Sequence, residues 1–149
     1  MGFNTQFTPY PERLVFKEAI PPTSVTAAGA TDGAAVDINE FEGNIAIVVD
    51  AILATAGTTP TLTFTVEHRA DSGDSWGAVP ADALIDASLG TADTFDVVTA
   101  AANGGVQVKG LVRARCKAQI RVVATVGGTS TPSFKFSAIL VVSNKYGDQ

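Results

Sequence analysis

Alternation of apolar and polar residues predicts β-strands along most of this chain. The segment Thr61–His68 places its Leu, Phe, Val and His on one face and three Thr and a Glu on the other. A period of two is that of a half-buried strand. Ser133–Val142 alternates in the same way, but from Ile139 onward it is apolar on both faces. A strand with two apolar faces lies inside a sandwich or against another chain, so we expect a partner there.

Similar segments follow one another at short spacing, joined by turns rich in Gly, Asn, Asp and Pro. The expected strands are Ala34–Ile38, Ile45–Leu53, Thr61–His68, Thr94–Thr99, Val106–Val112, Gln119–Val126 and Ser133–Val142. They predict an all-β fold, a single antiparallel β-sandwich or jelly-roll-like domain. Only Pro80–Leu89 has the pattern of a short helix, because Pro80 and Asp82 suit a helix start and Gly90 an end.

The first 22 residues differ from the rest, since they combine aromatic residues with four prolines. We expect an extended arm, Met1–Pro22, then a linker, Thr23–Gly33, and the sandwich domain, Ala34–Gln149. The free energy gained by burying the arm's aromatic side chains is smaller than the conformational entropy cost of ordering its backbone. Pairing with its own domain or with a neighbouring subunit would supply the difference. The expected interface residues of the arm are Phe3, Phe7, Tyr10, Arg13 and Phe16.

Charge and hydropathy narrow the choice of partners. The formal net charge is −5 and the sequence pI is about 4.6, which disfavours binding to a nucleic-acid backbone. No apolar run is long enough to span a membrane, and the N-terminus lacks the pattern of a signal peptide. We therefore expect a soluble protein made in a cytoplasm. Arg113, Arg115 and Lys117 form a basic cluster that suits an acidic partner or an edge kept soluble.

Residues that carry chemistry are scarce. A single histidine, His68, lies in register with the apolar side of its strand, and a single cysteine, Cys116, is expected to be a small buried hydrophobe. One histidine and one cysteine cannot build a zinc site of the usual kinds. The carboxylates of Asp71 and Asp74 are too few for calcium, so a turn is expected there. We expect no enzyme activity, no catalytic residue, no cofactor and no metal.

Three stretches resemble head decoration, or cement, proteins of tailed bacteriophages. They are Thr59–Trp76, with its strand, Asp/Gly turn and Ser-Trp; Ala118–Ser130, with a strand and a Gly/Thr hairpin; and the closing strand Phe134–Ser143. The resemblance implies a β-sandwich body on the outer surface of an expanded capsid, often as a homotrimer. Such a protein would bridge neighbouring copies of the major capsid protein and stabilise the shell without performing a reaction.

Two other classes remain open on the sequence. A carbohydrate-binding β-sandwich would use Trp76, the sole tryptophan, as a stacking platform beside loop acids. Another virion component, such as a tail tube or head completion subunit, would share the β-rich composition with few histidines.

Overall fold

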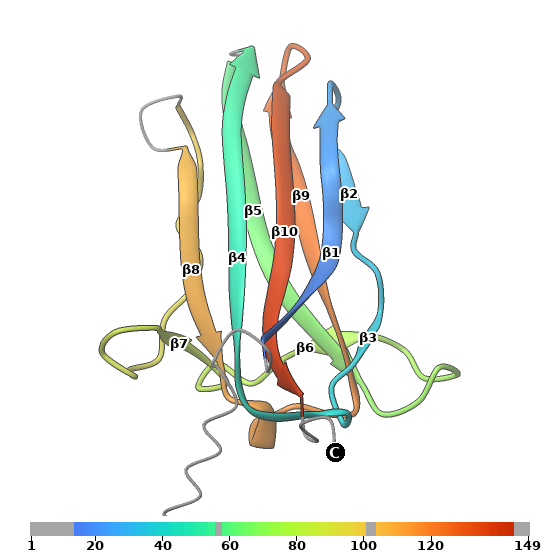
Figure 1. Cartoon of the computed structure of the whole chain (residues 1–149). Helices are drawn as coiled ribbons and strands as arrows, with labels where there is room; N and C mark the ends of the chain where they lie inside the picture. The colour runs from blue at the N-terminus through green and yellow to red at the C-terminus, as the bar shows by residue number, and fades with distance from the viewer. Residues whose placement is uncertain (1–13, 56–57, 101–103, 145–149) are drawn as a thin grey trace, which may run out of the picture.

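The computed structural model describes residues 14–55, 58–100 and 104–144, which form two antiparallel β-sheets packed face to face (Figure 1). Sheet A contains, in spatial order, β1 (Leu14–Val25), β10 (Ser133–Asn144), β4 (Phe41–Thr55), β8 (Gly105–Leu111) and β7 (Leu84–Asp86). Sheet B contains β2 (Gly29–Asp32), β9 (Gln119–Thr129), β5 (Thr58–Arg69) and β6 (Gly77–Ala78), with β3 (Val36–Asp37) also paired to β9. The predicted antiparallel β-sandwich is confirmed.

The strand order is that of a jelly roll. Strands of the first half of the chain pair with strands of the second half in mirrored order: β1 with β10, β2 with β9, β4 with β8, and β5 with β6. When this double ribbon wraps around itself, β10 comes to lie beside β4 and β9 beside β5. These eight strands, to which the short β3 and β7 are added, wrap into two sheets as in a jelly roll, an architecture of viral capsid and lectin domains.

The core lies between the inner faces of the two sheets. Alternate side chains of β4, β5, β9 and β10 are buried there, as the period of two predicts. Phe64 of β5 contacts Phe95 and Phe136 edge-on, with both ring centroids 6.0 Å away. Each such large apolar side chain stabilises the sandwich by roughly 1.5–3 kcal/mol through burial.

The expected helix at Pro80–Leu89 is wrong. Its first residues form a turn in which Ala83 donates to the carbonyl of Pro80 at 2.9 Å, and Leu84–Asp86 is the short strand β7, paired to β8. The carboxylate of Asp86 then accepts hydrogen bonds from the amides of Ser88 and Leu89. This side-chain capture of backbone amides competes with helix formation. Among the described residues, no helix has the length and hydropathy of a membrane span.

The expected strand Thr94–Thr99 is also wrong. The segment makes one isolated bridge, in which Val98 and Leu62 exchange backbone hydrogen bonds of 2.9 Å. Phe95 and Val98 both point into the core, at 4 % and 0 % exposure. Because these two apolar residues are three positions apart, the segment cannot follow the alternation of a regular strand.

Part of the segment expected as an arm and linker is strand in this structure. Residues 14–22 lie in β1, which pairs with β10 of the same domain, and the following residues complete β1 and form β2. Pro21 and Pro22 coincide with an irregularity in the β1–β10 register, at the edge of sheet A. Prolines are tolerated at such edge positions because they donate no hydrogen bond. Main-chain pairing with its own domain thus orders this part of the segment.

Candidate interaction surfaces

The outer face of sheet A is apolar and open to solvent. Register across β1, β10, β4 and β8 brings eight small or large apolar residues together on this face. We call it the apolar face; its residues are Phe16, Ala46, Val48, Ile52, Val106, Val108, Ile139 and Val141. Four large side chains on it are exposed: Phe16 by 65 %, Ile52 by 54 %, Val106 by 66 % and Val108 by 44 %. Such a contiguous patch indicates a contact surface.

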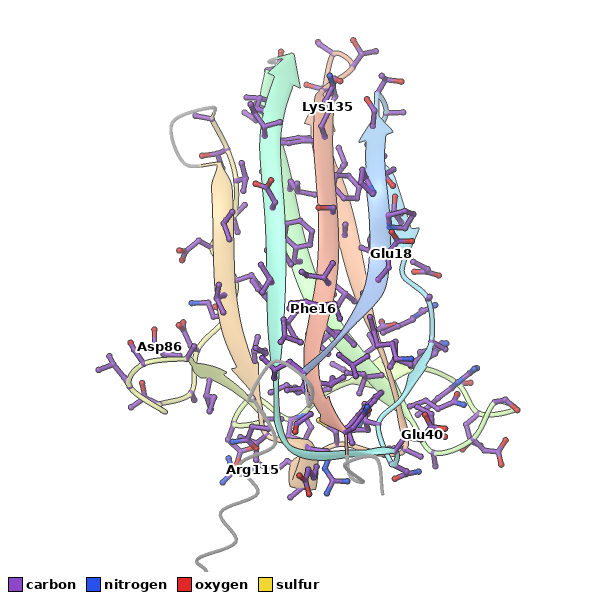
Figure 2. All side chains as sticks on the ribbon, viewed as in Figure 1. Phe16, Glu18, Glu40, Asp86, Arg115 and Lys135 are labelled. Atoms are coloured by element: carbon purple, nitrogen blue, oxygen red, sulfur yellow. The ribbon has the colours of Figure 1, made fainter. Side chains whose placement is uncertain are left out.

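The apolar face is viewed directly in Figures 1 and 2, with sheet B behind it. Phe16 lies toward the end at which β1 begins, and Lys135 lies near the opposite end (Figure 2). An open groove of about 670 Å³ runs across this second end, beside Pro22 of β1. Asp50 and Lys135 are among the residues that line it. The face thus carries Asp50 and Lys135 toward this second end, and a further acid, the exposed Glu18 of β1, beside Ile139 (Figure 2).

The outer face of sheet B has the opposite character. Along β5 it presents three threonines, then Glu67 and Arg69, as the sequence predicts. Arg121 of β9 forms ion pairs with Glu67 at 2.7 Å and with Asp32 at 2.8 Å. This face therefore resembles an ordinary solvated surface, and the sandwich is one-sided in its exposed chemistry.

A second surface lies at the end of the sandwich where β1 begins. Arg113–Arg115 forms a 3₁₀ helix that follows β8. Arg115 pairs with Asp82 at 3.0 Å, and it lies at this end in Figure 2. Arg113 and Lys117 have no ion-pair partner among the described residues. We call Arg113, Arg115 and Lys117 the basic end.

The predicted interface residues fall in different places. Phe16 belongs to the apolar face, and Arg113, Arg115 and Lys117 belong to the basic end. Phe3, Phe7, Tyr10 and Arg13 lie outside the described residues. The structure therefore divides the described members of the predicted set between two surfaces.

Sequence reasoning missed the part of the apolar face that β4 and β8 contribute. The double apolar character of Ser133–Val142 predicted a partner on β10, and Ile139 and Val141 do face outward, half-buried. The same signal was present in β4, where Ile45–Val49 is apolar at every position. An antiparallel strand without alternation has an apolar residue on both faces, so Val48 and its neighbours could have been found.

Trp76 does not close the core; it lies against the outer face of sheet B. The guanidinium carbons of Arg69 and Arg121 lie 4.4 Å and 4.7 Å from its ring centroid. These cation–π contacts use ring surface that stacking on a sugar would need. The geometry gives a carbohydrate site no specific support.

His68 and Cys116 are placed as the sequence predicts, toward the interior. The imidazole Nδ1 of His68 accepts a hydrogen bond of 3.3 Å from the amide of Lys117, and the side chain is 8 % exposed. Burial, with the nearby charge of Lys117, lowers the pKa of His68. Cys116 packs against the core, and burial raises the pKa of its thiol to about 11. The thiol of Cys116 is therefore less nucleophilic at neutral pH than an exposed cysteine.

The carboxylates are held in separate local structures. The carboxylate of Asp71 accepts a hydrogen bond from the amide of Gly73, and the carbonyl of Asp71 accepts one from the amide of Asp74. These bonds form the expected turn. Hydrogen bonds from Ser88 and from Lys109 lower the pKa of Asp86 and Asp93, respectively. Within residues 14–55, 58–100 and 104–144, no group of three His, Cys, Asp or Glu residues could hold a metal.

No protein-family profile and no curated protein sequence matches the chain. Among solved structures, it is similar to a chain of disulfide-linked pili from Bacillus endospore appendages, with 11 % identity, a TM-score of 0.42, and coverage of 89 % of this chain and 88 % of that one. It is also similar to VP2 of the infectious bursal disease virus subviral particle, with 13 % identity, a TM-score of 0.49, and coverage of 89 % and 33 %. A third neighbour, from the Gx strain of the same virus, has 11 % identity, a TM-score of 0.48, and coverage of 91 % and 33 %. The chain spans about a third of the two viral chains, and none of the three shares enough sequence to transfer a site residue by residue.

Proposed function

We propose that this chain is a capsid decoration protein of a tailed bacteriophage. It binds the outside of an expanded head as an oligomer and bridges neighbouring copies of the major capsid protein. Its role is mechanical, because the bridges resist the internal pressure of packaged DNA. The resemblance of Thr59–Trp76, Ala118–Ser130 and Phe134–Ser143 to such proteins supports the proposal, and so does the jelly-roll fold.

The observation that carries the proposal is the contrast between the two sheet faces. A protein that acts alone in water exposes few contiguous apolar side chains. Here the outer face of sheet B is charged and polar, whereas sheet A exposes Phe16, Ile52, Val106 and Val108 together. This one-sidedness is typical of a subunit in an assembly.

Attachment to the shell is assigned to the basic end and to the first 13 residues. Leu14 begins β1 at the end where Arg115 lies (Figures 1 and 2). An acidic capsid surface would attract the cations of the basic end. Phe3, Phe7, Tyr10 and Arg13 would add apolar and charged contacts. Each contact is weak, but repetition within an oligomer raises the avidity.

Cosedimentation with expanded phage heads that lack the protein tests this proposal. We expect saturable binding with a fixed number of copies per shell. Deletion of residues 1–13 should weaken binding and leave the domain folded, because the deletion ends before β1. Exchange of Arg113 and Lys117 for Gln should also weaken binding, whereas Thr125→Glu, on the outer face of sheet B, should not.

Two outcomes would overturn the assignment. Absence of binding to heads would remove the decoration role, and rings formed without binding would favour a tail tube or head completion subunit. Full binding by both the deletion and the Gln variants would place attachment elsewhere on the molecule.

A further inference from the structure

The middle of the apolar face is formed by two antiparallel neighbours, β10 and β4. Their outward residues are matched in four rows: Val141 with Ala46, Ile139 with Val48, Ser137 with Asp50, and Lys135 with Ile52. On these two strands, two rows are wholly apolar, and the other two contain an acid, Asp50, and a base, Lys135. Asp50 and Lys135 are both exposed, and no described residue forms an ion pair with either.

We propose that a second copy of this chain covers the apolar face, in a dimer whose two-fold axis runs along the strands between β10 and β4. This deepens the proposed function, because it names the occupant of the face that carries it. The dimer does not depend on a capsid, so the two proposals can fail separately.

The symmetry operation makes the face complementary to itself. A two-fold axis in this position exchanges β10 and β4 while keeping every row at the same height. Ile139 then lies over Val48 of the second copy, and Ser137 lies over Asp50 of the second copy. A hydroxyl therefore meets a carboxylate, and the apolar rows meet each other, as an isologous interface requires.

The same operation gives each central charge a partner. Lys135 comes to lie over Ile52 of the second copy, and Asp50 of that copy is two residues, or about 7 Å, farther along β4. A lysine side chain spans that distance. Two Lys135–Asp50 pairs thus form, one on each side of the axis. The grooves that contain these residues face each other, and water can fill the space between them.

The flanking strands are complementary in size in one row, whereas in the next row the exchange places the exposed Glu18 of β1 over Val108 on β8 of the second copy. The row of Val141 and Ala46 continues to Phe16 on β1 and to Gly110 on β8. The two-fold axis therefore places the exposed ring of Phe16 over Gly110 of the second copy, which has no side chain. Ile85 of β7 lies beside that glycine: a Cβ at Gly110 would be 3.0 Å from its Cγ1. Phe16, the bulkiest exposed residue of the face, therefore packs on the apolar surface formed by Gly110 and Ile85 of the second copy.

The available area is sufficient for a stable pair. Strands about 4.8 Å apart, three of them about 33 Å long over the face and the shorter β8 about 23 Å long, present on the order of 600 Å² of sheet. A standard interface buries about 800 Å² of accessible surface on each partner, and a pleated sheet exposes more than its flat area. Aligned sheets cross at about −30°, so facing strands diverge toward their ends. Residues of the two copies therefore oppose one another most closely in the central rows of β10 and β4.

Charge exchange at Asp50 and Lys135 tests the dimer with the full chain in the absence of capsids. Sedimentation velocity and native mass spectrometry over a dilution series should detect a dimer. Asp50→Lys and Lys135→Asp should each raise the dissociation constant by about tenfold or more, because each places like charges across the axis. Mixing the two variants should restore a dimer as the heterodimer, in which both pairs have opposite charges. Thr65→Lys, on the outer face of sheet B, is the control and should leave association unchanged.

A second measurement does not depend on the folding of variants. A carbodiimide that joins amines to carboxylates should give a covalent dimer of the unmodified chain, with Lys135 linked to Asp50 in its peptide map. A monomer at every concentration, a trimer as in the resembling decoration proteins, or failure of the mixed variants to pair would overturn the dimer. Cosedimentation with heads would still decide the proposed function in each of these cases.

Discussion

The amide of Ala34 donates a hydrogen bond of 2.8 Å to the carbonyl oxygen of Ala19, and this contact ties the chain after β2 to β1. The preceding residue, Gly33, donates at 2.8 Å to the carbonyl of Val122 on β9. Two consecutive amides therefore bind one strand of sheet A and one of sheet B. They close the edge of the sandwich next to the apolar face.

Gly33→Ala should destabilise the protein because there is no room for a Cβ at this junction. An added Cβ would lie 2.6 Å from the carbonyl oxygen of Val122 and 2.7 Å from that of Ala19. Backbone atoms of two strands would have to move, at a cost of about 1–3 kcal/mol in the free energy of unfolding. Urea denaturation of the variant and the unchanged chain measures this difference in the free energy of unfolding. Gly73→Ala, at a site with no atom within 4 Å, is the matched control and should change stability by less than about 0.5 kcal/mol. Equal effects of the two substitutions would contradict the close approach.

Ile47→Ala and Ile52→Ala compare the two faces of one strand. Ile47 is fully buried in the core and Ile52 is 54 % exposed on the apolar face. In the monomer, Ile47→Ala should lower the free energy of unfolding by about 2–5 kcal/mol, since it leaves a cavity. Ile52→Ala should cost less than about 1 kcal/mol there. Denaturation over a range of protein concentrations separates this cost from self-association, which should weaken only in Ile52→Ala. A large decrease in the free energy of unfolding for Ile52→Ala at high dilution would mean that Ile52 is buried within the monomer.

The sequence predicts the strands of this protein better than their partners. Alternation located β5, β9 and β10 within a few residues, because burial on one face leaves a local signature in each strand. Pairing of β1 with β10 joins opposite ends of the chain, and no local pattern encodes such a contact. The helix expected at Pro80–Leu89 failed because hydrogen bonds to Asp86 and pairing with β8 outweigh local propensity. The apolar face was predicted only at β10, since its extent depends on the register of four strands.

Cys116 should react slowly in the folded protein. Burial raises the pKa of its thiol from 9.0 to about 11, and only the thiolate is nucleophilic. At pH 8 the thiolate fraction should therefore be about 100-fold lower in the folded than in the unfolded chain. Alkylation by iodoacetamide, followed by mass spectrometry with and without urea, measures the ratio. The rate in the folded chain should keep rising with pH beyond pH 9, and a plateau near pH 9 would show that the thiol is not shifted.

His68 should make the protein less stable as the solution is acidified below its ordinary pKa of 6.5. Burial, and secondarily the charge of Lys117, lowers the pKa of His68 in the folded state. Below pH 6.5 the unfolded chain therefore binds a proton that the folded chain does not, so the free energy of unfolding falls as pH falls. Well above pH 6.5 the imidazole is neutral in both states, and this dependence disappears. The shifted carboxylates Asp71, Asp86 and Asp93 have pKa values below 3.8 and do not titrate in this range. His68→Asn retains an acceptor for the amide of Lys117 and should remove the slope between about pH 5 and 7 in urea denaturation. The same slope in this variant and in the unchanged chain would show that another group is responsible.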